Sequence, residues 1–457
     1  MRVTVFGGAC EIGGNQILLE GRETKILLDF GRNFARESKY FAEPFLAARK
    51  PEQLFALGLL PDIPSIYRWD KREPEVDGVF LSHAHLDHMD YVRFLDLEKV
   101  PVYTGEGTWR IIIAREVTGF RWESEYRLAT YKDTSAQLSE CYESRWRVKP
   151  EQVFRTGRKI KVGEFEISPV HVDHSIPAAY GFVIDGPEGR VVYTGDLRFH
   201  GPKREMSEDF LGASEEPDLL IMEGTNVLES RPSSEAEVEE KVRGILERGR
   251  GLVAASFSTV DIDRMRTFFR VAQQTGRKFV LSMRQAALLE FLRPEVEAGI
   301  IELPFLPGDP QVEIFSRGKE KPYNWERKLM NRYGTVDSQW VSEHQQEVLL
   351  FATFYDMLEL LATKPKPGSV FIYSESEPWD EEGEIEFGKL ENWLEFLGMP
   401  MFQVHASGHA SSLELRDMIE ELKPKKVVMV HCERPELFGK FTGWPLQCPE
   451  RGVPIEA

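Results

Sequence analysis

Short apolar runs separated by turn-forming residues dominate the first 200 residues, a pattern that predicts β-strands. The runs lie at residues 3–6, 16–20, 25–29, 76–81 and 100–103. Residues 159–196 predict a further group of antiparallel strands, with turns at Gly163 and at residues 185–189. Helical spacing of apolar residues occurs at 89–95 and again at 108–117. We therefore expect the first part of the chain to be rich in β-sheet.

Between about residue 233 and residue 398 the pattern changes to helices that alternate with strands. Helices are predicted at residues 235–248, 262–274, 285–297 and 385–397, and strands at 252–257, 279–282 and 369–373. Such alternation is typical of a parallel sheet covered by helices. The chain then returns to a helix at 412–422 and a strand at 427–430. We expect an α/β lobe inserted into the first domain.

Three stretches lack sustained periodicity. Residues 31–75 are expected to form a long connection over the mouth of a site, with one helix that begins at Pro51. Residues 121–150 mix aromatic side chains with arginines, so the aromatics could stack on nucleic-acid bases, although packing in a core is the preferred interpretation. Residues 375–386 contain seven acidic side chains and no basic one, which favours a solvated loop.

Length and composition limit the classes of protein to consider. At 457 residues, the chain exceeds what one hydrophobic core usually serves. The net charge of −18 repels nucleic acid at long range, but it leaves a locally basic cleft open. No leader-like segment precedes the first strand, no apolar run is long enough to span a membrane, and the four cysteines are scattered. We expect a cytoplasmic protein with reduced thiols and no membrane partner, in which Cys10 and Cys432 serve as small packing residues.

The most informative stretch follows the predicted strand at 76–81. His83, His85, Asp87 and His88 place four metal-binding side chains within six residues. In a strand that runs into a tight loop, His83 and His85 fall on one side, and Asp87 and His88 turn toward a second position. Two metal ions can then share one loop. Imidazole and carboxylate groups suit zinc or manganese, so the stretch predicts a hydrolytic metal centre.

Other residues are ambiguous when each is considered alone. Asp29 ends an apolar run, where it can form a turn, cap a helix or orient a metal ligand. His174 and Asp196 follow predicted strands, in an order that suits a fifth ligand and a carboxylate between two metals. Ser411 and Glu414 have the spacing of a capping box, which predicts a helix start with free amides for an anion.

Taken together, these motifs resemble the β-CASP branch of the metallo-β-lactamase superfamily, and within it the ribonuclease J group. The matching segments are Asp29 and residues 7–15, 83–88, 174–177, 194–196, 223–226, 407–410 and 430–433. The resemblance implies an α/β protein, with a metallo-β-lactamase αββα sandwich and an inserted β-CASP α/β domain. Residues 1–225 and 401–457 would form the sandwich, and residues 226–400 the inserted domain.

The resemblance also implies two zinc ions per chain, with Mn²⁺ or Mg²⁺ as alternatives. The implied ligands form two groups: His83, His85 and His174 for one ion, and Asp87, His88 and His431 for the other. Asp196 would bridge the two ions, and Asp29 would orient a ligand from outside the centre.

Catalytic and substrate-binding roles follow from the same resemblance. Asp87 would accept the proton of the nucleophile, and His409 would donate to a phosphoryl oxygen or to the leaving oxygen. Glu223 would orient the catalytic groups near it. The substrate phosphate would be held at Ser407, Gly408, His409, Ser258 and Arg264.

The function implied is a zinc-dependent ribonuclease for single-stranded RNA, a 5′-to-3′ exonuclease that could also cleave internally. Two alternatives stay open, a hydrolase of small phosphodiesters or esters and a non-catalytic subunit of an RNA-processing complex. The chain ends soon after residue 433, so we expect any homo-oligomer to form without the extra C-terminal domain of longer bacterial relatives.

Overall fold

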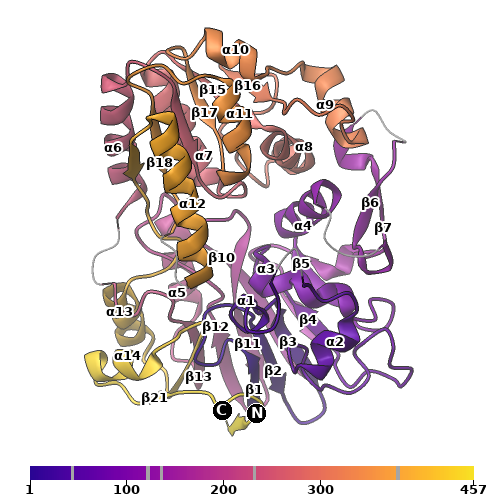
Figure 1. The fold of residues 1–457 in the computed structure, drawn as a ribbon. Helices are drawn as coiled ribbons and strands as arrows, with labels where there is room; N and C mark the ends of the chain where they lie inside the picture. Colours follow the sequence, from indigo (N-terminus) through magenta and orange to yellow (C-terminus); the bar gives the residue numbers. More distant parts are fainter. Residues whose placement is uncertain (43–45, 120–123, 134–136, 230–232, 377–380, 457) are drawn as a thin grey trace. The chain divides into compact units, whose positions relative to one another are not determined.

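The computed structural model describes the chain except for residues 43–45, 120–123, 134–136, 230–232, 377–380 and 457 (Figure 1). It divides into two compact units. The first unit comprises Met1–Thr130, Ser144–Pro232 and Gly408–Ala457, and the second comprises Tyr131–Glu143 and Ser233–Ser407. The sequence predicts domain boundaries near residues 225 and 400, and no pattern in it assigns residues 131–143 to the second unit.

The first unit contains two seven-stranded sheets. One has the order β22-β1-β2-β3-β4-β5-β8, formed by Pro454–Glu456, Arg2–Gly7, Gln16–Glu20, Lys25–Phe30, Gly78–Phe80, Val102–Gly105 and Val153–Phe154. The other has the order β21-β20-β13-β12-β11-β10-β9, formed by Leu446–Gln447, Lys426–Val430, Leu219–Glu223, Gly189–Tyr193, Ala179–Gly186, Phe165–Val172 and Ile160–Val162. The strands predicted in this part of the chain are thereby confirmed.

Alternation along these strands builds the core between the sheets. Val3 and Val5 of β1 and Ile17 and Leu19 of β2 belong to one buried cluster with side chains of the second sheet, including Phe182 of β11. Because strand side chains alternate between faces, the intervening residues of the second sheet point outward and pack against helices. These helices are α5 (Arg204–Ala213) and α13 (Ser412–Leu422). The first unit is therefore the expected sandwich of sheets and helices.

The segment after β4 differs from its prediction. Instead of a regular helix over residues 89–95, one helical turn, α3 (Leu86–Met89), is followed by a 3₁₀ helix, Asp90–Phe94. Met89 adopts φ −134° and ψ −17°, outside the α region, and this interrupts the helix. The α4 helix, Glu106–Thr118, forms as predicted, and α2, Pro51–Ala56, begins at the expected proline within the long connection. The connection also contains the short helix α1, Phe34–Glu37.

The second unit contains a six-stranded parallel sheet of order β16-β15-β17-β14-β18-β19. Its strands are Val312–Phe315, Lys278–Ser282, Val348–Phe351, Val253–Ser256, Val370–Tyr373 and Met401–Gln403. The predicted helices correspond to α6 (Glu235–Arg248), α7 (Ile262–Gln274), α8 (Met283–Glu297) and α12 (Glu381–Leu397). Since α12 begins at Glu381, the prediction of a solvated loop for residues 375–386 is wrong in its second half. Residues 377–380 of that stretch lie outside the described residues.

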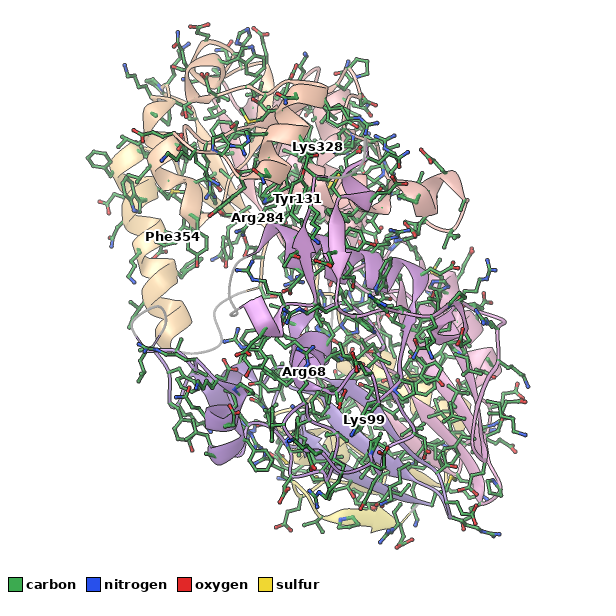
Figure 2. The ribbon with its side chains drawn as sticks, turned by 90° about the vertical axis from the view of Figure 1, so that its right-hand side faces the viewer. Arg68, Lys99, Tyr131, Arg284, Lys328 and Phe354 are labelled. Carbon is green, nitrogen blue, oxygen red and sulfur yellow. The ribbon has the colours of Figure 1, made fainter. Side chains whose placement is uncertain are left out.

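The sequence analysis missed several elements between residues 300 and 368. They are β16, β17, α9 (Asn324–Tyr333), α10 (Ser338–Glu343) and α11 (Met357–Ala362). One of them holds the segment Tyr131–Glu143 in the second unit: Lys328 of α9 lies 3.0 Å from Asp133 Oδ1 and 2.9 Å from Cys141 Sγ. Figure 2 shows Lys328 beside Tyr131, in agreement with the electrostatic interaction between the two side chains.

The aromatic stretch at residues 121–150 forms a small two-stranded sheet, β6 (Ala129–Tyr131) with β7 (Tyr142–Ser144). Trp146 is buried, as the packing interpretation requires, and Trp122 lies outside the described residues. Among the described helices, none combines the length and apolar character needed to cross a membrane.

Candidate metal centre

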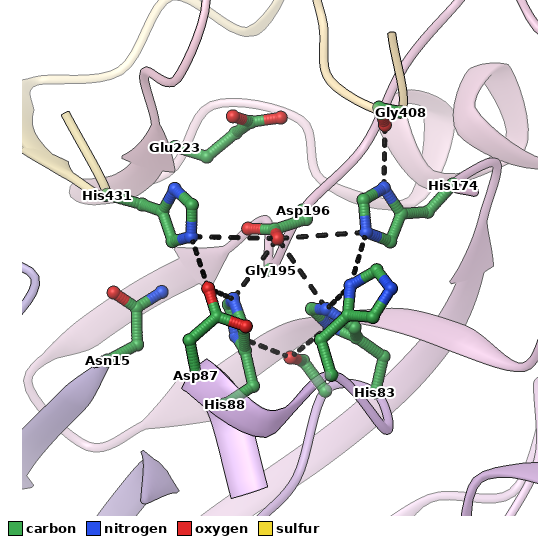
Figure 3. Close-up of polar contacts among 12 residues, drawn as sticks. Asn15, His83, Asp87, His88, His174, Gly195, Asp196, Glu223, Gly408 and His431 are labelled. Atoms are coloured by element: carbon green, nitrogen blue, oxygen red, sulfur yellow. Dashed lines mark hydrogen bonds and ion pairs between the residues drawn. The ribbon is translucent and has the colours of Figure 1, made fainter. Parts of the chain in front are cut away.

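The predicted ligands converge at one end of the two sheets of the first unit (Figure 3). Each lies in or next to a loop that follows a strand: His83, His85, Asp87 and His88 after β4, His174 after β10, Asp196 after β12 and His431 after β20. Because the strands form a rigid core, they fix the starting point of each loop. Residues separated by up to about 350 positions therefore meet within a few ångströms, as the contact between Asp87 and His431 shows.

The first group of ligand atoms gathers around His85. Its Nδ1 lies 3.0 Å from His83 Nε2 and 3.1 Å from His174 Nε2. Asp196 Oδ2 lies 3.5 Å from His83 Nε2 and 3.7 Å from His174 Nε2. These four side chains each offer one atom, and all of these atoms lie within 4.8 Å of one another.

The second group lies on the other side of Asp196. His431 Nε2 is 3.1 Å from Asp87 Oδ2, and His88 Nε2 is 3.9 Å from the same oxygen. Asp196 Oδ2 lies 3.1 Å from His88 Nε2 and 3.9 Å from His431 Nε2. A single carboxylate oxygen therefore faces both groups of ligands.

Hydrogen bonds on the outer side of the rings determine which nitrogen faces the centre. The outer nitrogens and their partners are His88 Nδ1 with Asp29 Oδ2 (2.8 Å), His174 Nδ1 with Gly408 O (2.6 Å), His431 Nδ1 with Thr225 Oγ1 (2.8 Å) and His83 Nδ1 with Ser82 Oγ (3.0 Å). A carboxylate or carbonyl oxygen can only accept, so the Nδ1 atoms of His88 and His174 carry the proton. Their Nε2 lone pairs then point inward, where a metal ion would bind.

These groups fit a cation. Burial lowers the pKa of His83 and His174 well below the ordinary value and that of His85 to about 3, so these rings are neutral at pH 7. Their lone pairs crowd together, and Asp196 Oδ1 is buried without a hydrogen-bond partner among the described residues. Buried polar atoms are normally satisfied, and nitrogen and carboxylate ligands suit zinc. A metal ion would therefore satisfy atoms that the protein itself leaves unsatisfied.

The carboxylates supply the charge for such a cation. Although burial opposes ionisation, the neighbouring imidazoles hold the pKa of Asp87 and Asp196 below the usual range. Burial also disfavours the charged form of His88, but Asp196, Asp29 and Asp87 raise its pKa well above the ordinary value. Imidazole binds a metal only through a free lone pair, so metal binding at His88 Nε2 competes with protonation of that nitrogen.

The loops approach one another so closely that two glycines are required. A Cβ atom on Gly31 would lie 1.6 Å from Asp87 O, and one on Gly13 would lie 2.8 Å from Asp87 Oδ2. Gly13 also has φ +76°, a conformation that favours glycine. Asp29 and His431 adopt φ of 58° and 51° without being glycine, a strain of about 1–3 kcal/mol each, which persists only where the surroundings fix the conformation.

Glu223 and His409 form a second polar pair beside the ligands. His409 Nδ1 lies 3.1 Å from Glu223 Oε2, and the other Glu223 oxygen accepts from Leu197 N (3.2 Å) and Ala410 N (3.4 Å). Burial opposes protonation of His409, but Glu223 and Asp196 raise its pKa to about 9. The Glu223 side chain is 1% exposed and that of His409 is 20% exposed, so Glu223 orients a histidine that a substrate can reach.

Comparison with known proteins gives two family models and several relatives that are similar to this chain. The model of the "Beta-lactamase superfamily domain" family matches residues 64–247, and the model of the "Zn-dependent metallo-hydrolase RNA specificity domain" family matches residues 399–437. Ribonuclease J of Pyrococcus abyssi is 26% identical, over 100% of this chain and 94% of its own length. The chain is similar to the ribonuclease J group of the metallo-β-lactamase superfamily. The resemblance to the β-CASP branch that its motifs suggested is confirmed.

More distant or longer relatives extend the comparison. Ribonuclease J of Sinorhizobium meliloti is 25% identical over 83% of this chain, which spans 61% of that protein. A crystal structure described as a protein of unknown function from Enterococcus faecalis is 23% identical, covers 99% of both chains and superposes with a TM-score of 0.71. That structure supports the fold alone.

The residues predicted to contact the substrate phosphate in this ribonuclease J-like chain differ in their exposure to solvent. Arg264 is fully buried, where it pairs with Glu235 and donates to Ser374 O and Ala406 O. It has no exposed surface for a substrate, which contradicts the prediction, and it instead supports the loop that leads to Gly408. Ser258 is exposed.

The segment 407–410 also has a structural role. The carbonyl of Gly408 accepts from His174, and a Cβ atom on Gly408 would lie 2.7 Å from Ser175 Oγ. Ser407 is partly exposed and stays a predicted substrate contact. The expected capping box of Ser411 and Glu414 is confirmed at the start of α13.

Sequence reasoning missed two hydroxyl groups. Ser82 and Thr225 hold the outer nitrogens of His83 and His431, yet neither was a candidate. Their only signal was their position beside residues already chosen. Among the cysteines, which are free thiols, Cys432 is buried as expected, whereas Cys10 is exposed and the prediction that it is a packing residue is wrong.

Proposed function

We propose that this chain is a zinc-dependent ribonuclease that hydrolyses phosphodiester bonds of single-stranded RNA with two bound ions. The main observation in support is Asp196 Oδ2, which faces both groups of ligands, at 3.1 Å from His88 Nε2 and 3.5 Å from His83 Nε2. The match to a family of metallo-hydrolases with RNA specificity and the ribonuclease J relatives favour RNA as the substrate. We further propose 5′-to-3′ exonuclease action, with internal cleavage as a second activity of the same centre.

Two divalent ions held by these ligands would lower the pKa of a water molecule toward neutrality and stabilise the charge that develops on phosphorus. The protein supplies the remaining groups. The side chains of Asp87 and His409 are 23% and 20% exposed, whereas that of Asp196 is 1% exposed. The exposure of Asp87 supports the proposal that it accepts the proton of the attacking water, in addition to its proposed role as a ligand.

His409 would act on the other side of the scissile bond. Glu223 holds its Nδ1 at 3.1 Å, which leaves Nε2 to donate to a phosphoryl oxygen or to the leaving 3′-oxygen. Thr225 Oγ1, 3.1 Å from the same Nδ1, also contacts the ring of His431 and so ties the two histidines together.

The test is cleavage of a 3′-labelled single-stranded RNA with a 5′-monophosphate by zinc-loaded protein. Asp87→Ala removes a ligand and the proton acceptor, so we expect cleavage to fall by at least about 10²-fold. Asp417→Ala, which changes an exposed surface pair with Arg416, should leave cleavage unchanged. Full activity in Asp87→Ala would contradict the proposal.

The products identify the mode of cleavage. Continuous shortening from the 5′ side to a small labelled end would support exonuclease action, and discrete internal fragments would support an endonuclease instead.

The net charge of −18 favours a second candidate, a hydrolase of small phosphodiesters or esters. RNA binding that weakens steeply with salt would argue against it, because counterion release follows the number of phosphate contacts. Intact RNA together with rapid hydrolysis of bis(p-nitrophenyl) phosphate would favour it. A non-catalytic role is less well supported, since the described residues contain every predicted ligand.

A further inference from the structure

The carboxylate of Asp29 is fully buried, so groups of the protein, and not bulk water, form the hydrogen bonds that hold it in position. Oδ1 accepts from Ser82 N at 2.7 Å. Oδ2 accepts from Ser82 Oγ at 2.7 Å and from His88 Nδ1 at 2.8 Å. The same Oδ2 accepts a third hydrogen bond, from the hydroxyl of Tyr193 at 2.7 Å. Neither the motifs nor the proposed mechanism assigns a role to this tyrosine.

Tyr193 is the last residue of β12, three residues before Asp196. It is fully buried and its ring packs beside Phe182. Its hydroxyl oxygen accepts from Asn15 Nδ2 at 3.2 Å, which leaves the hydroxyl proton for Asp29. Burial and the Asp29 carboxylate also raise the pKa of Tyr193 well above its ordinary value, so the donor stays protonated at neutral pH.

Asn15 connects this tyrosine to a second ligand. It closes the glycine-rich motif at residues 7–15 and is 1% exposed. Its backbone N donates to Asp87 O at 2.9 Å, while its side chain holds Tyr193 (Figure 3 shows Asn15 beside Asp87 and His431). Asn15 therefore contacts Asp87 directly, and Tyr193 reaches His88 through Asp29. Asp87 and His88 both belong to the second group of ligands.

We propose that Tyr193 is a positioning residue for the second metal site, because it fixes the Asp29 carboxylate that orients His88, and that Asn15 sets the direction of its hydroxyl. The inference rests on the proposed two-metal centre. It predicts an asymmetry, because Asp29 contacts His88 directly but reaches His83, in the first group, only through Ser82. Loss of the Tyr193 hydroxyl therefore weakens the second site and spares the first.

The experiment compares zinc binding by metal-free wild-type protein and Tyr193→Phe, titrated with Zn²⁺ alone against a chromophoric chelator. The phenylalanine keeps the ring and removes one donor. We expect two ions per wild-type chain, and in the variant an unchanged first affinity with a second affinity about tenfold weaker, since loss of a ligand's outer partner costs about 10–100-fold. With Co²⁺ in place of zinc, the absorption bands of the second ion should shift.

Tyr333→Phe is the matched control. Tyr333 donates to Glu290 Oε1 at 2.7 Å in the second unit, so this variant also removes a phenol that donates to a buried carboxylate. Its two zinc affinities should equal those of the wild type. Suppose that the wild type and Tyr333→Phe each bind two ions. The inference is then overturned if Tyr193→Phe binds both ions as tightly as the wild type, or if its affinity for both ions falls equally. A wild-type protein that binds a single ion would instead overturn the two-metal centre itself.

Circular dichroism decides whether Tyr193→Phe is folded. If it is not, Asn15→Ala leaves Tyr193 in place and removes only the group that orients its hydroxyl. The same selective weakening of the second site is then expected, and unchanged binding in this variant would overturn the inference.

Discussion

At the scale of single residues, the centre depends on groups that bind no metal. Four of the predicted ligands could be found from the sequence because their spacing in residues 83–88 is dense and a strand precedes them, whereas His174, Asp196 and His431 required the family resemblance. Ser82 and Thr225 could not, because a hydroxyl becomes informative only when its partner is known. Thr225 and His431 are 206 positions apart, and local patterns carry no signal over such a separation.

Glu223→Gln tests whether Glu223 orients His409 without contributing to metal binding. The amide can still accept from Leu197 N and Ala410 N, but it no longer holds the charge that orients and protonates His409. We expect kcat for RNA cleavage to fall by about 10²- to 10⁴-fold while zinc content stays at the wild-type value. Glu239→Gln, which alters a surface pair with Arg270, is the control. Loss of zinc in Glu223→Gln would show that Glu223 supports the ligands instead.

At the scale of elements, the strands of the first unit were predictable because each is a short apolar run bounded by turn formers. The stretch from residue 300 to residue 368 was not, because its elements are short and its helices α9 and α10 are mostly polar. In α9 only Trp325, Glu326 and Leu329 are buried, and α10 has a single buried residue, Val341. Such elements form because the rest of the unit covers them, and a periodic pattern of so few apolar residues cannot reveal that.

The start of α13 offers a test of how an element supports the site. Ser411 caps this helix two residues after His409, with its side chain in a reciprocal pair with Glu414. Ser411→Ala should lower the free energy of unfolding by about 1 kcal/mol, measured in urea, and also slow RNA cleavage. Ser234→Ala removes the equivalent capping box of α6 in the second unit. It should cost similar stability and leave cleavage unchanged; equal effects of the two variants on cleavage would contradict this role for α13.

At the scale of the whole molecule, the length of the chain predicts two lobes, and the chain has two compact units. The segment Tyr131–Glu143 could not be assigned from sequence, because its place in the second unit depends on contacts with residues such as Lys328, almost 200 positions away. The net charge of −18 gave no information about the site, where the relevant quantity is the arrangement of a few buried carboxylates and imidazoles.

Metal removal should affect the two units differently. All predicted ligands lie in the first unit, so bound ions stabilise that unit by mass action, by about 4 kcal/mol when free metal is about 1,000 times the Kd. We expect a chelator to lower the melting temperature of one calorimetric transition and to spare the transition of the second unit. Equal shifts of both transitions, or no shift, would contradict the assignment of the metal to the first unit.

The position of His431 in the chain has a consequence for biosynthesis. His431 follows β20 and meets Asp87, so the centre is incomplete until the segment after residue 407 has left the ribosome. At elongation rates of about 5–20 residues per second, roughly 20–70 s separate the synthesis of Asp87 from that of His431. During that time the nascent chain has most of its ligands but not the last, and it is tethered to its own messenger. A ribonuclease of the proposed kind that is built in this order becomes active only after its last ligand, His431, has been synthesised.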